Sequence, residues 1–249
     1  MSKQGFHAMG LIGGLLLAGA AAAEVKVDLG YAHSTNQIGS MVIGSAYNGA
    51  VLGLSGSTAK GLYYDGSFLY AIGTTKTSDF NPLLAGASSS EGTLKGSWGQ
   101  AKLGLGYRLW QDQAFSLTPL IRAQTNMMNN TYASAQINSD LDLAVYSLAV
   151  GARLEYSPVA EFTFAAEGAY AKALAGSLSG KTSIAGTSVA ATADVELGGF
   201  FIMGIEVGYR PHTMYGAFLK WGRLQESLLS DSILSLSHSD LMIGASCFL

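Results

Sequence analysis

The residues that could support hydrolysis gather at two places in the chain. Asp140 and Asp142 form a carboxylate pair, and His238 and Asp240 form a His–Asp pair near the C-terminus. Paired carboxylates can activate a water molecule, and a His–Asp pair can supply a general base. Ser237 adds a hydroxyl beside His238, but a run of neighbouring residues does not have the geometry of a catalytic triad. These residues can act together only if the fold turns them toward one another.

Other kinds of chemistry have no matching pattern. His33 and His212 are isolated and have no Cys partners, so the sequence predicts no metal site. No glycine-rich phosphate loop occurs, and no cofactor is predicted. Cys247 is the single cysteine, which excludes an intramolecular disulfide. The formal charge of −3, without a clustered basic surface, excludes nucleic acid as a partner.

The elements that position these residues are predicted to be strands. Between residues 199 and 222, apolar side chains alternate with glycine and charged side chains on both sides of a turn that contains Pro211. This period of two is typical of β-strands. The apolar set is Phe201, Met203, Ile205, Val207 and Tyr209 before the turn, and Tyr215, Ala217, Leu219 and Trp221 after it.

The same alternation recurs along the chain and predicts ten strands. The other eight lie at about 24–33, 49–57, 64–73, 98–109, 115–127, 141–156, 162–174 and 238–249. Short turns alternate with long polar loops, which are predicted at 34–48, 78–96, 129–140, 177–192 and 227–237. Pro119 weakens the strand at 115–127, because proline lacks a ladder donor. Eight strands remain as the alternative if this strand and 49–57 are misassigned.

The N-terminus has the layout of a secretory signal peptide. Lys3 precedes an apolar stretch, which ends in a run of small residues at 20–23. We therefore predict a signal peptide over residues 1–23 and one β-domain over 24–249. After Ala23 no apolar run is long enough for a spanning helix. Two architectures suit such an exported chain: a secreted β-sandwich with a buried core, or a closed barrel whose apolar face meets lipid.

Turn asymmetry and aromatic placement favour the barrel. Tyr107 and Phe115 flank one short turn, Tyr156 and Phe162 the next, as expected for an interfacial aromatic girdle. With the signal peptide and a final strand at the C-terminus, the chain resembles the small outer-membrane barrels of Gram-negative bacteria. The resemblance implies an all-β, transmembrane, antiparallel up-and-down barrel in the bacterial outer membrane. It also implies outer-membrane lipid and the barrel-insertion machinery as partners, although Phe248, an aromatic residue of the kind that ends such chains, is next to last.

If the apolar faces meet lipid, strand parity assigns the charged side chains to the interior. Six acids and seven bases nearly balance, which favours a cross-linked interior over a wide, ion-selective channel. The function predicted is structural, or a narrow channel for small solutes. The predicted lumen-lining charges are Lys26, Asp28, Asp65, Lys102, Arg108, Arg122, Arg153, Glu155, Glu167, Glu196, Glu206, Arg210 and Lys220.

Two alternative functions follow from the same barrel. Ten-stranded outer-membrane proteases carry a carboxylate pair and a His–Asp pair at the external rim. Asp140 and Asp142, however, have the parity of the lipid-facing residues, so we predict no catalytic residues and no enzyme. A surface adhesin acting through its loops is the other alternative. Its candidate contact residues are sparse and include Tyr47, Phe80 and Tyr132.

Overall fold

The computed structural model describes residues 22–38, 43–77, 92–111, 114–134, 137–184, 187–194, 198–227 and 235–249. Their regular structure consists of β-strands. Across these ranges, no helix has the length and hydropathy needed to cross a membrane. The strands are β1 (Ala22–Ile38), β2 (Ile43–Thr58), β3 (Leu62–Thr77), β4 (Gly92–Tyr107), β5 (Trp110–Gln111), β6 (Phe115–Ala133), β7 (Ile137–Val159), β8 (Phe162–Ile184), β9 (Thr187–Asp194), β10 (Gly199–Tyr209), β11 (Tyr215–Ser227) and β12 (Ser235–Phe248).

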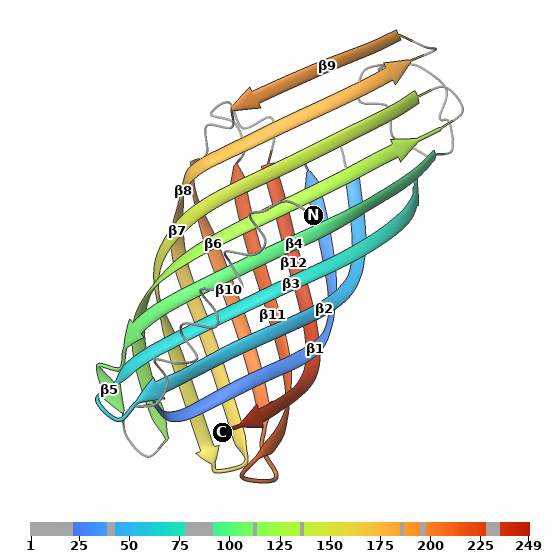
Figure 1. Cartoon of the computed structure of the whole chain (residues 1–249). Helices are drawn as coiled ribbons and strands as arrows, with labels where there is room; N and C mark the ends of the chain where they lie inside the picture. Colours follow the sequence, from blue (N-terminus) through green and yellow to red (C-terminus); the bar gives the residue numbers. More distant parts are fainter. Residues whose placement is uncertain are drawn as a thin grey trace.

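Ten of these strands close into an antiparallel barrel. Two strands are not part of the ring: β5 pairs only with the end of β6, and β9 pairs only with β8. Ring strands that follow one another along the chain are paired. The ring is completed where β8 pairs with β10 and β1 pairs with β12. Figure 1 shows the closed wall and β9 projecting from it. The predicted ten-stranded barrel is confirmed, and the alternative of eight strands is wrong.

The apolar faces of the strands point outward. Phe201 and Ile205 of β10 are 65% and 55% exposed, whereas Phe200 and Ile202, on the opposite face of the strand, are buried. A soluble sandwich would bury Phe201 and Ile205, since apolar side chains that face water cost free energy. Exposure on this scale therefore requires a lipid environment.

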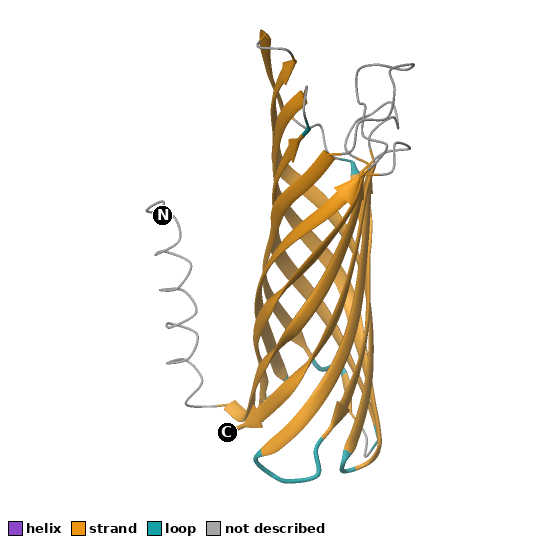
Figure 2. Cartoon of the chain, turned by 90° about the vertical axis from the view of Figure 1, so that its right-hand side faces the viewer, coloured by secondary structure: helices purple, strands orange, loops and turns teal. Residues whose placement is uncertain are grey.

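The strands extend further than the sequence pattern indicates at one end of the barrel. We call the end that carries the turns at 59–61, 160–161 and 210–214 the turn end, and the opposite end the far end. At the far end, β6 and β7 occupy most of the predicted loop 129–140, and β8 and β9 occupy that at 177–192. These segments are rich in Ser, Ala and Asn. They still form strands, because the hydrogen bonds between strands come from backbone groups that every such residue has. Figure 2 shows the wall continuing past the barrel on this side.

The other predicted loops differ less. β1 and β2 extend into 34–48, so that residues 39–42 remain between them outside the described ranges. Residues 78–91 and 228–234 also lie outside the described ranges, whereas 92–96 and 235–237 belong to strands. Pro119 has no backbone N–H to donate, and it fits in β6 because the ladder between β6 and β4 ends next to it. β4 last pairs at Leu120, and β5 takes over at Leu117.

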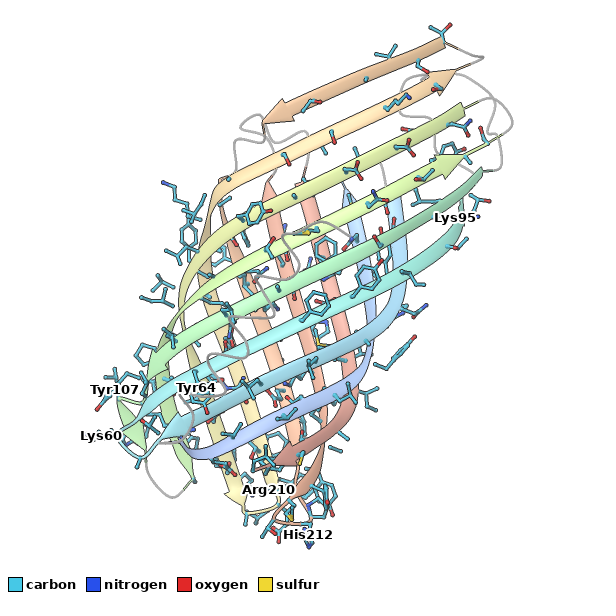
Figure 3. The ribbon with its side chains drawn as sticks, in the orientation of Figure 1. Lys60, Tyr64, Lys95, Tyr107, Arg210 and His212 are labelled. Carbon is cyan, nitrogen blue, oxygen red and sulfur yellow. The ribbon has the colours of Figure 1, made fainter. Side chains whose placement is uncertain are left out.

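Aromatic rings encircle the turn end, as predicted. Phe115 stacks on Tyr156 with ring centroids 4.4 Å apart, and Phe162 lies 4.8 Å from Tyr209. Trp110 extends this row beside Phe115. Figure 3 shows Tyr107 at the same end of the wall. Amphipathic rings are stable where hydrocarbon gives way to headgroups, so the row marks one membrane boundary.

Candidate functional site in the barrel interior

Arg122 on β6 is the centre of a first ion-pair group. Its guanidinium contacts the Glu167 carboxylate of β8, with Nη2 lying 3.0 Å from Oε2, and it reaches Asp65 Oδ2 of β3 at 2.5 Å. The Arg122 side chain is only 7% exposed. Charges enclosed in this way are stable only when they are paired and hydrogen-bonded. This group therefore joins wall strands on both sides of β6.

Glu206 on β10 is the centre of a second group. Its two carboxylate oxygens accept from Arg153 Nη2 of β7 at 2.9 Å and from Lys26 Nζ of β1 at 2.6 Å. Arg153 Nε also donates to Glu155 at 2.8 Å. Because β7, β10 and β1 are not adjacent in the ring, these bonds cross the interior rather than follow one wall.

Asp28 on β1 is the centre of a third group. Its carboxylate accepts from Lys220 Nζ of β11 at 2.5 Å and from Ser246 Oγ of β12 at 2.6 Å. The Lys220 ammonium also lies 4.8 Å from the ring centroid of Phe218, close enough for a cation–π contact. That ring lies over Gly244, where a side-chain Cβ would come within 2.8 Å of it.

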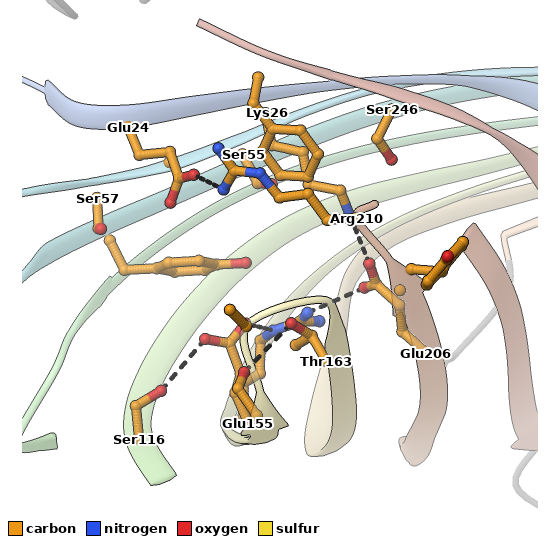
Figure 4. Close-up of a pocket in the computed structure, with 18 of the residues that line it drawn as sticks. Glu24, Lys26, Ser55, Ser57, Ser116, Glu155, Thr163, Glu206, Arg210 and Ser246 are labelled. Carbon is orange, nitrogen blue, oxygen red and sulfur yellow. Dashed lines mark hydrogen bonds and ion pairs between the residues drawn. The ribbon is translucent and has the colours of Figure 1, made fainter. Parts of the chain in front are cut away.

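The mouth at the turn end carries two further predicted charges, Arg108 and Arg210. A cavity of about 320 Å³ opens there, and Figure 4 shows Glu24 and Arg210 at its edge. Arg210 pairs with Glu24, and its guanidinium lies 3.9 Å from the Phe248 ring. Arg108 reaches Glu155 at 3.4 Å. The sequence predicted that Glu24 begins a strand, but Glu24 was not among the predicted lumen-lining charges.

Two predicted charges stand apart from these groups. Lys102 on β4 lines a second cavity of about 150 Å³, together with Arg122, Glu167 and Lys220. Among the described residues, no acidic group lies within ion-pair distance of its ammonium. Glu196 lies outside the described residues. The structure therefore brings most of the predicted charges together in the half of the interior nearest the turn end, which we call the ionic half.

The other half of the interior contains a cluster of large apolar side chains with buried amides and hydroxyls among them, and the parity of the charged residues did not predict this cluster. Inward-facing positions nearer the far end carry Trp98, Leu143, Val145 and Phe200, all of them buried. We call this the apolar half. The sequence does indicate that Trp98 faces inward, because Trp98 and Lys102 are an even number of residues apart on β4 and so point to the same face. The predicted interior residues were all charged, so the apolar cluster was not predicted.

His238 and Asp240 also face the interior and lie in the apolar half. Nε2 of His238 is 2.7 Å from Asp240 Oδ1, the imidazole stacks on Trp98 at 4.1 Å, and Nδ1 contacts Asn36. Ser34 donates to the carboxylate of Asp240, not to the imidazole. A serine nucleophile needs the imidazole as its base, so this order of contacts is not a catalytic triad. The parity of β12 could have assigned Asp240 to the interior.

The other candidate residues do not join His238. Asp140 and Asp142 are exposed on the outer face of β7, where Asp142 contacts Asn129. His33 lies beside Asn48, and His212 lies near Tyr215 in the turn 210–214. In the part of the chain that the structure describes, no three His, Cys, Asp or Glu residues are grouped for a metal ion.

Comparison with known proteins establishes the fold alone. No family model matches the sequence, and no curated protein matches it. The solved structure of the outer membrane protease OmpT from Escherichia coli is similar, with a TM-score of 0.56 at 7% identity, over 91% of this chain and 96% of that one. The translocator domain of the autotransporter NalP from Neisseria meningitidis has a TM-score of 0.47 at 9% identity, over 98% and 97%. This chain therefore has the fold of the Gram-negative outer-membrane β-barrels, and its apolar exterior suits that membrane.

Proposed function

We propose that this chain is a structural outer-membrane barrel whose interior is closed by ion pairs and by an apolar core. The observation that carries the proposal is the bridge through Glu206, which ties Arg153 and Lys26 together across the interior. Open porins of 16–18 strands have a lumen wide enough to stay filled with water. In ten strands, bridges of this kind occupy the space that a solute would need.

The packing of the apolar half supports the same proposal. Two cavities of the interior are lined mainly by residues of the ionic half, whereas Trp98, Phe200 and Val145 are at most 1% exposed. Close-packed side chains leave few voids larger than a water molecule. A narrow path for small solutes would have to pass through this core.

Recordings from planar lipid bilayers test the closed interior. We expect wild-type protein to give no steady conductance steps. The double variant Trp98→Ala/Arg122→Ser should conduct, because it removes a bulky side chain from each half. A faster gel migration before boiling than after it verifies that each sample is folded. Regular small steps from folded wild-type protein would overturn the closed interior and favour the narrow channel.

The orientation in the membrane is part of the proposal. The two ends of the barrel sequence meet at the turn end, where Val25 and Leu249 exchange backbone hydrogen bonds. Short turns face the periplasm in barrels of this class. The far end, with β9, then faces the outside of the cell. Protease added to intact cells should cleave near β9 and leave the turns intact, whereas the reverse pattern would overturn this orientation.

Export and insertion add two expectations. The mature protein should begin near Glu24, and mass spectrometry of protein from the outer membrane checks this. Phe248 lies against Arg210 rather than lipid, and Leu249 is the exposed terminal residue. We expect the insertion machinery to accept the variant Leu249→Phe at least as well as the wild type, measured as folded protein per cell. Lower yield of this variant would contradict an aromatic insertion signal.

A non-enzymatic role is part of the same proposal. His238 and Asp240 are at most 2% exposed and are covered by Trp98, so a peptide bond has no access to the imidazole. We expect no peptide hydrolysis by folded protein. Cleavage that disappears in His238→Ala but persists in His33→Ala would overturn this role.

Surface binding is a second candidate function, favoured by the strands that project at the far end. The ends of β7 and β8, together with β9, form a ladder beyond the barrel. Binding of labelled cells to the protein, lost when residues 175–198 are replaced by a short turn, would support it. Unchanged binding by that variant would exclude the projecting sheet as the contact.

A further inference from the structure

The free edge of β9 is the feature that neither the barrel nor its interior explains. β9 pairs with β8 over its full length, from Thr187 opposite Ile184 to Asp194 opposite Ser177. It ends the strand order, so among the described residues no strand pairs with its other side. An edge strand presents unpaired N–H and C=O groups, which form a template for another strand.

This edge lacks the features that usually prevent strand addition. The sequence TSVAATAD contains no proline and no basic residue, and its pairing with β8 has no bulge. Proteins commonly protect such edges with Lys, Pro or a bulge. Val189 is 67% exposed. The strand is therefore regular, almost uncharged and accessible.

The sequence of β9 is complementary to itself in the antiparallel direction. A two-fold axis that places Ala190 opposite Ala190 of a second copy would place Ser188 opposite Thr192, which is a hydroxyl pair of the kind that stabilises sheets. It would place Thr187 opposite Ala193 and leave Asp194, the only charge of the strand, beyond the paired residues, so that no like charges meet. A second copy of this chain therefore fits the edge.

The geometry of the sheet then decides where the second copy sits. β8 belongs to the barrel wall and continues into the projecting sheet, which stands along the barrel axis (Figure 2). Antiparallel strands that share a sheet are related by a half-turn about the normal to the sheet. That half-turn reverses the barrel axis. The second barrel then points the opposite way, as it would in a membrane facing the first.

Two copies in one membrane cannot form this pair. Two such copies are related by rotation about the membrane normal. β9 runs obliquely to the barrel axis (Figure 1), so this rotation would give the two β9 strands opposite inclinations where their edges meet. Crossed strands cannot form a ladder. We propose that β9 pairs antiparallel with β9 of a second copy in an opposing membrane, so that the protein joins two bacterial surfaces.

This inference rests on the proposed orientation but not on a closed interior. The test uses two populations of vesicles with different dyes, each containing the full-length barrel, and counts vesicle pairs that carry both dyes. Wild-type protein should tether the populations. Ser188→Lys/Thr192→Lys in both populations should abolish tethering, because each Lys then faces a Lys, and Ser188→Glu/Thr192→Glu in both should do the same.

The charge-swapped combination is the decisive arm. Lys-variant vesicles mixed with Glu-variant vesicles should tether again, since each Lys now faces a Glu. The control Thr131→Lys/Ala133→Lys puts the same charge on exposed positions of β6, away from the edge, and should tether like the wild type. The gel-mobility shift shows that every barrel is folded, and conductance of the same samples reports separately on the interior.

A cross-link tests the register. In a Cys247→Ser background, Ser188→Cys in one population and Thr192→Cys in the other should form a disulfide between vesicles after a mild oxidant is added. Failure of folded wild-type protein to tether would overturn the proposal. So would tethering by the Lys variant alone, or a cross-link that forms only between copies of a single vesicle.

Discussion

In the ionic half of the interior, Arg122, Arg153 and Glu206 hold the walls together through directed hydrogen bonds. In the apolar half, Trp98, Phe200 and Leu143 fill the same cross-section by packing. Both halves lie within the same ten strands and behind the same lipid-facing surface. They differ in what a substitution leaves behind: an unpaired charge in one half and a cavity in the other.

The two halves also fill the interior in different ways. Ion pairs form at fixed distances and angles, so the volume between the groups stays open, as in the cavities of about 320 and 150 Å³. Apolar side chains have no directional requirement and can close the remaining gaps. The ion pairs of the ionic half therefore join particular strands, and the proposed closure of the barrel depends on the packing of the apolar half.

The largest effect is expected from Trp98→Ala in the apolar half. Removing a fully buried indole should lower the free energy of unfolding by about 3–5 kcal/mol, because lost burial adds to the cost of a cavity. Urea unfolding in lipid vesicles, followed by the gel-mobility shift, measures this. Trp110→Ala is the matched control, since Trp110 lies exposed at the turn end. Equal losses for the two variants would contradict a packed apolar half.

A somewhat smaller loss is expected from Arg122→Met in the ionic half. This change leaves the carboxylates of Asp65 and Glu167 without their guanidinium, which costs about 3 kcal/mol for enclosed charges. The triple variant with Asp65→Asn and Glu167→Gln should recover most of the loss, because no charge is then left unpaired. If the triple variant is as unstable as Arg122→Met, the effect comes from packing rather than from charge. The same urea titration distinguishes the two outcomes.

A moderate effect is expected where the ionic half needs glycine. A Cβ on Gly244 would lie 2.3 Å from the Leu29 backbone oxygen, 2.5 Å from Gly30 Cα and 2.8 Å from the Phe218 ring. Gly244→Ala should therefore cost about 1–2 kcal/mol through overpacking. Gly204→Ala is the control, because the nearest atom to its Cβ is 3.6 Å away. Phe218→Leu should relieve part of the cost, and no relief would mean that the backbone of Leu29 and Gly30 causes it.

The smallest effect is expected at the mouth. Arg210 and Glu24 are 33% and 49% exposed, so water and salt screen their attraction. Arg210→Ala should change the free energy of unfolding by less than about 1 kcal/mol. The change should shrink further in high salt, whereas that of Arg122→Met should persist. A large, salt-resistant effect of Arg210→Ala would show that the mouth belongs to the enclosed ionic half.

The alternation of apolar and polar residues was sufficient to predict the barrel and the direction of each strand face. In β10, Phe201 and Ile205 could be assigned to lipid and Glu206 to the interior from parity alone, because successive side chains point to opposite faces of a strand. The length of the strands was not predictable in this way. In β9 and the ends of β6 to β8, polar residues lie on both faces, so the period of two disappears although the ladder continues.

By itself, the sequence determined which side chains face inward, since parity is a local property of each strand. Only the tertiary structure decided which of them meet. Arg122 lies between Asp65 and Glu167, and His238 stacks on Trp98, because closure of the ring and the tilt of its strands bring together residues far apart in the chain. The free edge of β9 has the same origin. β8 pairs with β10 along its lower part and with β9 along its upper part, and no local pattern records where one partner gives way to the other.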